Sequence, residues 1–465
     1  MDGTRLSLPE RLEPGACITL IPAGPSHLTD TAVRIVLSNI GTFGDINPLI
    51  ALSLELKRRG HTPVLALPNV FRPKIEPLGL EFRAVRPDID PTNNVLVEMV
   101  YDIKHGTEHG LRNFLFPALR QTYDDLMAAA TEPERADLML LGELNYAGPL
   151  VAERTGIPWA SYVLAPLSFF SAYDPPVLPP FPLLAHVDRF AGMGHGMKRL
   201  ARWTTRAWPE PIYALRKELG LRRGANPLFD AKHAPELVLA LFSRVLGVPQ
   251  KDWPPHTLIT GFCFYDSDAG NAALPAHLEE FLAEGEAPIV FTLGSAAVLA
   301  AGDFYEVSAQ AALRLERRAV LLIGTDPRNR LQQALPPSIC VAEYAPYSAL
   351  LPRAALVVHQ GGVGTTAQCL RAGKPMLMMP YSHDQPDNAR RMRRLGVART
   401  IQKSKYTADR VAEMLRGMLP DAVLAARAAQ VAEQLRREDG VKTACDALEN
   451  LHARARQQVP VRAGA

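Results

Sequence analysis

Short runs of apolar, β-branched residues alternate along this chain with longer stretches in which apolar residues recur every three or four positions. In the first such unit, Val33–Ser38 predicts a buried strand, Gly41–Asp45 a turn, and Val64–Leu67 the next strand. The helix between the strands is expected to begin at an N-cap on Asn47 and to end at Gly60. This alternation is typical of α/β folds built on parallel sheets.

The same pattern restarts near residue 287, where strands are expected at 289–293, 319–323, 356–359 and 376–379. The chain is therefore predicted to contain two Rossmann-like halves that face each other. The expected division is an extension of poor order at 1–31, a first domain at 32–248, a second domain at 249–455 and a tail at 456–465.

Composition excludes several classes of protein. The 465 residues carry a net charge of only +3, which disfavours a nucleic-acid binder. The 5 cysteines are scattered and form no CxxC pair, as expected of reduced thiols in a cytoplasmic protein. No apolar run approaches the roughly 18 residues of a membrane-spanning helix. The oligomeric state is left open between monomer and homodimer.

The segment His359–Thr366 places glycines between a strand and a helix. Glycines allow close approach of the backbone to a ligand, and the first amides of a helix attract an anion. This favours a diphosphate at Gly361, Gly362, Gly364 and Thr365. The alternative is a tight turn that binds nothing.

A second polar segment, Pro380–Asn388, follows the next strand and is expected at the same carboxyl edge of the sheet. Asp384 accepts hydrogen bonds and Gln385 both accepts and donates them, which suits sugar hydroxyls. The alternative is that Asp384 or Asp387 only caps a helix.

Together these segments resemble the donor-binding signature of nucleotide-sugar-dependent glycosyltransferases of the UDP-glycosyltransferase family. The resemblance rests on Glu343–Tyr347, Leu350–Arg353, His359–Thr366, Leu370–Pro375 and Asp384–Asn388. Two further segments, 250–254 and 302–305, are similar to the bacterial branch with the rhamnosyltransferase of rhamnolipid synthesis. Gly41–Pro48 resembles the opening motif of sterol and glycopeptide glucosyltransferases. The resemblance implies two facing Rossmann-like domains, known as the GT-B fold, with the active site in the cleft between them.

The resemblance also implies roles for single residues. Tyr344 would stack on the nucleobase beside Tyr347, His359 and the helix amides would hold the diphosphate, and Asp384 and Gln385 would bind the sugar. Ala367 stands where plant relatives carry a ribose-binding glutamate, which leaves uridine or thymidine open. The expected donor-binding set is Gly44, Ser295, Tyr344, Tyr347, His359, Gly361, Gly362, Gly364, Thr365, Asp384 and Gln385.

The expected general base is Asp45, because the turn after the first strand contains no histidine, the residue that plant relatives use there. The alternative is that Asp45 only caps the following helix. Glu143 is a second carboxylate that would either assist or lie in an exposed loop.

The acceptor is expected to contact the first domain at Phe43, Glu143, Phe169 and Phe170, although core packing explains aromatic residues equally well. The basic stretch Lys198–Trp208 fits either a solvated helix with one buried face or a peripheral membrane contact.

No metal and no cofactor are expected. The DxD pairs Asp88–Asp90 and Asp266–Asp268 lie among Pro, Asn and Gly residues, as solvated turns do. Helix amides would stabilise the departing diphosphate instead.

The sequence thus predicts an inverting, metal-independent O-glycosyltransferase. It would move a hexose, glucose by default, from a UDP- or dTDP-sugar to a small apolar acceptor such as a lipid, sterol, polyphenol or other natural product. The alternatives are a rhamnosyltransferase of glycolipid synthesis, a nucleotide-sugar epimerase and a non-catalytic nucleotide-sugar-binding protein. A dehydrogenase is disfavoured because Gly41–Gly44 does not supply a GxGxxG turn.

Overall fold

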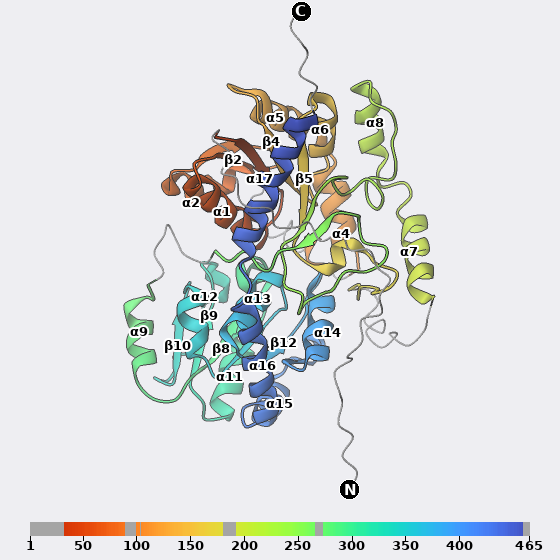
Figure 1. The fold of residues 1–465 in the computed structure, drawn as a ribbon. Coiled ribbons are helices and arrows are strands. Elements are labelled where there is room, and N and C mark those ends of the chain that lie inside the picture. Colours follow the sequence, from red (N-terminus) through yellow and green to blue (C-terminus); the bar gives the residue numbers. More distant parts are fainter. Residues whose placement is uncertain (1–31, 89–98, 103, 180–191, 266–272, 459–465) are drawn as a thin grey trace, which may run out of the picture. The chain divides into compact units, whose positions relative to one another are not determined.

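The computed structural model describes residues 32–88, 99–102, 104–179, 192–265 and 273–458, which form two parallel sheets (Figure 1). The first sheet has the strand order β3-β2-β1-β4-β5-β6-β7, and the second has the order β10-β9-β8-β11-β12-β13. Every strand pair is parallel. Each order reverses direction beside its first strand, as in doubly wound folds, so the prediction of two Rossmann-like domains is confirmed.

The first domain is built around strands that are buried on both faces. Helix α1 covers one face, and α5 and α6 cover the other. The strands are β1 (Arg34–Ser38), β2 (Thr62–Leu67), β3 (Glu81–Ala84), β4 (Leu138–Gly142), β5 (Trp159–Val163), β6 (Val238–Ala240) and β7 (Thr257–Ile259). The helices are α1 (Phe43–Arg58), α2 (Arg72–Ile75), α4 (Gly106–His109), α5 (Leu119–Thr131), α6 (Gly148–Thr155), α7 (Met193–Thr204) and α8 (Glu210–Glu218).

The second domain repeats this plan, and its predicted strands are confirmed to within one residue. Its strands are β8 (Ile289–Thr292), β9 (Ala319–Leu322), β10 (Ile339–Ala342), β11 (Leu356–His359), β12 (Met376–Met378) and β13 (Ala398–Thr400). Its helices are α9 (Ala276–Ala283), α10 (Gly294–Ala297), α11 (Phe304–Arg314), α12 (Tyr347–Leu350), α13 (Val363–Ala372), α14 (Gln385–Leu395), α15 (Ala408–Met418), α16 (Ala422–Leu435) and α17 (Gly440–Gln458).

The start of α1 differs from the prediction. Its N-cap is Thr42 and not Asn47, and Asp45 lies inside the first turn. The reason is a reciprocal capping box, in which the Asp45 carboxylate accepts a hydrogen bond from the Thr42 amide. The helix therefore begins at Phe43, five residues earlier than an N-cap at Asn47 would have allowed.

The domain boundaries also differ from the predicted ones. The first sheet includes β7, so the first domain extends past residue 248. Helix α17 follows the second domain in sequence but packs on α1 (Figure 1), with Leu448 and Leu451 buried in the core of the first domain. Residues 456–458 complete α17, whereas the expected extension at 1–31 lies outside the described residues.

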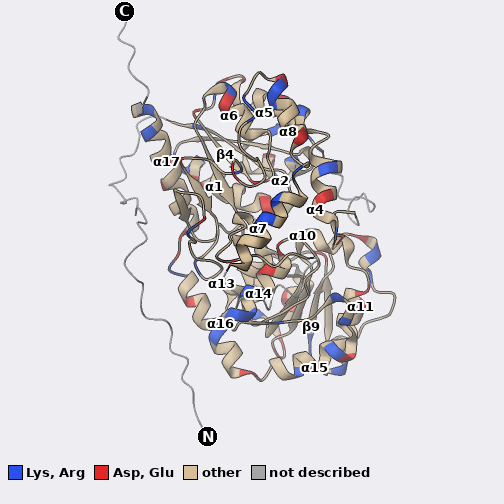
Figure 2. Ribbon diagram, turned by 90° about the vertical axis from the view of Figure 1, so that its right-hand side faces the viewer, with Lys and Arg blue, Asp and Glu red and all other residues tan. Residues whose placement is uncertain are grey.

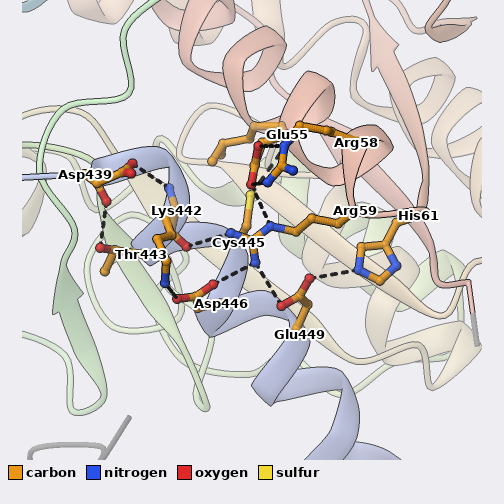
Figure 3. A network of polar contacts seen from close by, with 11 residues as sticks. Glu55, Arg58, Arg59, His61, Asp439, Lys442, Thr443, Cys445, Asp446 and Glu449 are labelled. Atoms are coloured by element: carbon orange, nitrogen blue, oxygen red, sulfur yellow. Dashed lines mark hydrogen bonds and ion pairs between the residues drawn. The ribbon is translucent and has the colours of Figure 1, made fainter. Parts of the chain in front are cut away.

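A cluster of charged side chains joins α1 to α17 (Figure 3). The Arg59 guanidinium lies 2.8 Å from a Glu55 oxygen, 2.7 Å from an Asp446 oxygen and 3.0 Å from a Glu449 oxygen. His61 Nε2 lies 2.9 Å from the other Glu449 oxygen. Only 13% of the Arg59 side chain is exposed, so this cation neutralises three carboxylates that converge on it.

Replacing Arg59 with alanine is expected to destabilise the folded protein by about 3 kcal/mol, because it leaves converging carboxylates without a cation. Urea denaturation would measure the change in the free energy of unfolding. Arg58→Ala is the matched control, since Arg58 is 73% exposed and its ion pair with Glu55 is solvated. Equal losses in the two variants would contradict the importance assigned to the cluster.

Candidate active site

The N-terminus of α13 is open to an anion. Its N-cap, Gly362, has no side chain to cap the helix, and Gly364 is exposed. A Cβ atom added to Gly364 would meet no atom of the described chain within 4 Å. The amides of Gly364 and Thr365 belong to the first turn, where a helix offers N–H groups without intrahelical partners. This helix start can therefore receive a diphosphate.

His359 at the end of β11 shapes the glycine turn. Its Nδ1 accepts a hydrogen bond of 3.0 Å from the Gly361 amide, which places the ring proton on Nε2. Burial lowers the pKa of His359 to about 3, so the ring is neutral. Gly361 has φ +93°, a conformation that favours glycine. The side chain is completely buried, and the predicted contact between His359 and a phosphate remains a prediction.

The first turn of α14 is tied to this glycine turn. Asn388 Nδ2 donates to Asp384 Oδ2 at 2.7 Å and to the Gly361 carbonyl at 3.0 Å. The Val363 amide also donates to the Asp384 carboxylate. The two polar segments that the sequence placed on consecutive strand ends are thus in direct contact.

Gln385 forms hydrogen bonds with backbone amides in this structure. Its Oε1 accepts hydrogen bonds from the amides of Tyr381, at 2.7 Å, and Ser382, at 3.2 Å. Gln385 therefore stabilises the turn that precedes α14, and its predicted bond to a sugar hydroxyl would have to come from the amide nitrogen.

Two other predicted donor residues, Tyr347 and Ser295, lie at or next to positions that approach Thr365 in the first turn of α13. The Tyr347 hydroxyl lies 2.8 Å from the Thr292 hydroxyl and also contacts the Thr365 hydroxyl. Ser295 is exposed in α10, directly after Gly294, where an added Cβ would lie 3.1 Å from Thr365 Oγ1. Tyr344 follows β10 and is 46% exposed, and its stacking on a nucleobase remains a prediction.

Asp45 lies at the start of α1 in the first domain. Its Oδ2 accepts hydrogen bonds from the Thr42 amide at 2.6 Å and from the Thr42 hydroxyl at 2.9 Å. Asp45 therefore caps its helix, as the alternative interpretation expected. The side chain is nevertheless only half-buried. Capping and a reactive role are compatible, because a carboxylate can accept several hydrogen bonds at once.

The charge of Asp45 acts on Asp384 although the two residues belong to different domains. Burial is the main cause that raises the pKa of Asp384 to about 7; the hydrogen bond from Asn388 opposes this increase, and the negative charge of Asp45 contributes to it. Burial also raises the pKa of Asp45, and the charge of Glu143 adds to this increase. Val363, the first residue of α13, packs on the core of the first domain, as does Phe43 in the first turn of α1, so the start of α13 and the start of α1 contact the same core.

The exposed-loop alternative for Glu143 and the acceptor prediction for Phe169 need correction. Glu143 is not an exposed loop carboxylate, because it accepts hydrogen bonds from Lys232 Nζ at 2.6 Å and from the Ser168 hydroxyl at 2.7 Å. Burial alone would raise the pKa of Glu143, but the Lys232 charge holds it below its ordinary value. Phe169 is only 6% exposed and packs on Trp253 with ring centroids 4.3 Å apart, so it belongs to the core.

Phe43 and Phe170 are half-buried. Phe43 meets the Phe71 ring edge-on at 5.1 Å, and Phe170 meets the Phe229 ring edge-on at 5.9 Å. Phe43 and Phe170 remain candidates for contact with an acceptor. Gly44, which the sequence assigned to the donor, follows Phe43 in the first turn of α1, and its contact with the donor remains a prediction.

Two family models match the chain. The Glycosyltransferase family 28 N-terminal domain matches residues 35–165, and the Erythromycin biosynthesis protein CIII-like C-terminal domain matches residues 309–447. The O-mycaminosyltylonolide 6-deoxyallosyltransferase of Streptomyces fradiae is 32% identical over 441 residues, which cover 90% of this chain and 97% of that relative. The chain belongs to the UDP-glycosyltransferase family.

Two further comparisons agree with this assignment. The sterol 3-beta-glucosyltransferase UGT80A2 of Arabidopsis thaliana is 26% identical, and the match covers 89% of this glycosyltransferase and 65% of the plant protein. The spinosyn rhamnosyltransferase SpnG, solved with thymidine diphosphate, has a TM-score of 0.63 at 18% identity. That match covers 90% of this glycosyltransferase and 100% of SpnG, and it shows the same fold.

The glycosyltransferase has a groove of about 530 Å³ on its first domain, along α6. The groove reaches Glu143, the carboxylate whose charge acts on Asp45. Its volume is that of a pocket for a small organic molecule. The apolar part of its lining includes Tyr146, Leu150, Ile157, Trp159 and Ile212.

The described part of the glycosyltransferase shows no group of three or more His, Cys, Asp or Glu side chains that could hold a metal ion. Asp90, Asp266 and Asp268 of the DxD pairs lie outside it, whereas Asp88 accepts a hydrogen bond of 2.9 Å from the Asn69 amide. Within the same ranges, no helix is both long and apolar enough to cross a membrane. Four cysteines are free and buried: Cys263, Cys340, Cys369 and Cys445.

The basic stretch Lys198–Trp208 forms much of α7, an exposed helix of this glycosyltransferase (Figure 2). Lys198 pairs with Asp252 and Arg202 with Asp230, while Leu200 and Trp203 are exposed. The ion pairs account for part of the basic character, and a membrane contact remains a prediction.

Sequence reasoning assigned no role to two residues that organise the site. Thr42 precedes Asp45 by three positions, the spacing of a capping box, and this signal was available in the sequence. Asn388 was part of the recognised motif, but its bond to Gly361 joins residues 27 positions apart, and no local pattern reveals such a contact.

The raised pKa of Asp384 predicts a pH effect on the stability of this glycosyltransferase. The unfolded carboxyl ionises near pH 3.8 and the folded one near pH 7, so the folded state holds the proton more tightly. Protonated Asp384 therefore stabilises the folded state at low pH, and this stabilisation is lost as the pH rises through about 7. Asp384→Asn should reduce this loss, measured as the change in Tm between pH 4.5 and 8. Parallel Tm profiles of the two proteins would contradict the assigned pKa.

Proposed function

We propose that the protein is an inverting, metal-independent O-glycosyltransferase. It transfers a hexose, glucose by default, from a UDP- or dTDP-sugar to a hydroxyl of a small apolar acceptor. The observation that carries this proposal is the contact of α1, which carries Asp45, with α10, together with the packing of Val363, at the open start of α13, on the core of the first domain.

The donor would lie on the second domain. The amides of Gly364 and Thr365 are suited to the diphosphate, and they gain strength as negative charge develops on the leaving group. Asp384 would accept a hydrogen bond from a sugar hydroxyl. This arrangement leaves the anomeric carbon facing the first domain and the leaving group held on the opposite side.

Asp45 would act as the general base. An acceptor hydroxyl that attacks the anomeric carbon must lose its proton, and the bond to the diphosphate oxygen breaks on the opposite face, which inverts the configuration. The raised pKa of Asp45 makes it a stronger base than a solvated carboxylate. Its hydrogen bonds to Thr42 hold the carboxylate in place for this step.

The groove along α6 is our candidate site for the apolar body of the acceptor, because it leads to Glu143 and so toward Asp45. The name of one relative contains O-mycaminosyltylonolide, and the name of another contains sterol. These names support a natural product or a sterol as the acceptor of this protein. Rhamnose is the second candidate sugar, and the name of SpnG supports it. SpnG was solved with thymidine diphosphate, which supports dTDP-sugars as candidate donors alongside UDP-sugars.

The test is to incubate the protein with UDP-glucose, dTDP-glucose and dTDP-rhamnose, each against a panel of sterols, phenols and apolar alcohols. Mass spectrometry identifies products, and NMR of the anomeric proton reports the configuration. We expect one donor to give a product with inverted configuration at full rate in EDTA. A retained configuration, or loss of activity in EDTA, would contradict the mechanism proposed here.

A further inference from the structure

Four charged side chains form a cluster where α14 meets segment 171–177 of the first domain. Asp387, Arg390 and Arg391 belong to α14, and Asp174 belongs to the segment. Asp387 is completely buried, and Arg390 and Arg391 are 2% and 8% exposed. Two carboxylates thus balance two guanidinium groups within a contact between the domains.

Asp387 connects α14 to the segment through one oxygen and holds Arg391 of its own helix with the other. Oδ1 accepts a hydrogen bond of 3.0 Å from the Val177 amide and lies 3.0 Å from an Arg390 nitrogen. Oδ2 accepts a bond of 2.7 Å from Arg391 Nε. Arg391 is thereby held with its outer nitrogens directed away from α14.

Asp174 completes the cluster from the other side. Its Oδ2 lies 2.6 Å from a terminal nitrogen of Arg391, and its Oδ1 lies 3.6 Å from one of Arg390. The same terminal nitrogens donate to the carbonyls of Pro175, at 2.9 Å, and Leu246, at 3.2 Å. These are charge-assisted bonds that only one relative position of helix and segment allows.

Segment 171–177 is in turn fixed within the first domain. Asp252 accepts hydrogen bonds from the Ser171 hydroxyl at 2.5 Å, from the Ala172 amide at 2.8 Å and from Lys198 of α7 at 3.0 Å. Gly194 of α7 lies so close that a Cβ there would come within 2.0 Å of the Ala172 carbonyl oxygen. The segment is therefore a fixed support for Asp174.

The turn of α14 that carries Asp387 also carries the donor-sugar residues. Asp384 and Gln385 precede it, and the next residue, Asn388, bonds both Asp384 and Gly361. One helical turn thus contacts the first domain through Asp387 and the diphosphate turn through Asn388. A shift of α14 relative to the first domain would move Asp384 relative to Asp45.

We propose that Asp387, Arg390, Arg391 and Asp174 are positioning residues for the transfer step, and that they set the distance between the donor sugar and the base. The proposal rests on the proposed function in one respect, the placement of the sugar at Asp384. Buried ion pairs of this kind add little stability compared with apolar packing, but they fix one arrangement of the parts they join. Reaction rates depend steeply on such placement, and about 1 Å of error costs about a hundredfold.

The test uses Asp174→Asn and Arg391→Gln in the full chain. Each is expected to lower kcat for transfer about ten- to a hundredfold. The affinity for the free nucleoside diphosphate should stay unchanged, because the start of α13 is untouched. A larger share of donor should be lost to water, measured as free sugar per nucleoside diphosphate released. Asp174→Glu keeps the charge and should recover part of the transfer rate.

Glu449→Gln is the matched control, since it removes a carboxylate from the other charged cluster, between α1 and α17. It should lower Tm and leave the ratio of transfer to hydrolysis unchanged. If the Asp174 and Arg391 variants only lose Tm, with an unchanged ratio and an unchanged kcat per folded molecule, the positioning role is wrong. If the unaltered protein transfers no sugar from any donor, the proposed function fails instead.

Discussion

Asp45→Asn is expected to slow transfer by about two to four powers of ten, the usual share of a general base. Asparagine keeps an oxygen that can accept the hydrogen bond from the Thr42 amide, so the start of α1 should survive. It cannot take a proton from the acceptor. The measurement is kcat at saturating donor and acceptor, together with the Kd of the nucleoside diphosphate, which should change little.

The capping role of Asp45 predicts a different result, and Asp45→Ala separates the two roles. Alanine removes the carboxylate half of the capping box and should lower Tm by more than asparagine does, since a lost capping interaction at a helix N-terminus costs about 1 kcal/mol. If Asp45 only capped α1, the asparagine variant would turn over at the normal rate. That outcome would remove Asp45 from the mechanism.

Gly364→Leu is expected to abolish tight donor binding without harming the fold. Side chains on a helix point back toward its N-terminus, so a leucine here would cover the amides of the first turn. The protein has room for it, because an added Cβ meets nothing within 4 Å in the described structure. Two charge-assisted hydrogen bonds are worth about 3 kcal/mol, so the Kd for the nucleoside diphosphate should rise about a hundredfold.

Gly196→Leu is the matched control, since Gly196 also lies on a helix, is exposed and has open space beside its Cα. It should leave the affinity for the nucleoside diphosphate unchanged. Gly364→Ala should give an intermediate loss, because a single methyl group covers less of the helix start. Equal affinity in Gly364→Leu and the unaltered protein would place the diphosphate elsewhere.

The sequence predicted well those features that depend on residues close together in the chain. The strand 356–359, its glycine turn and the helix to Gly373 follow from apolar runs and glycine positions, and all are present. Adjacent strand ends in a parallel sheet must lie together, so the contact between the glycine turn and Asp384 also followed. The start of α1 was wrong because Asn47 and Thr42 are both good caps, and only Thr42 has a reciprocal partner in Asp45.

Features set by distant contacts were missed. Glu143 looked like a loop carboxylate because its partner, Lys232, is 89 residues away. Phe169 was one of several aromatic residues in a proline-rich tract, and nothing local showed that Trp253 would cover it. The cluster of Asp174 with Arg391 joins segments that belong to different domains, and side-chain charge alone does not identify such a pair.

The position of α17 has a consequence for how the protein folds during its synthesis. Ala444, Leu448 and Leu451 complete an apolar core whose other members, such as Leu49 and Leu52, are made nearly four hundred residues earlier. During synthesis from the N-terminus, the early half must therefore keep that surface uncovered until residues 440–458 have left the ribosome, a period in which a chaperone or another protein can bind to it. Anyone who wishes to produce the early half alone should append residues 440–458 to it.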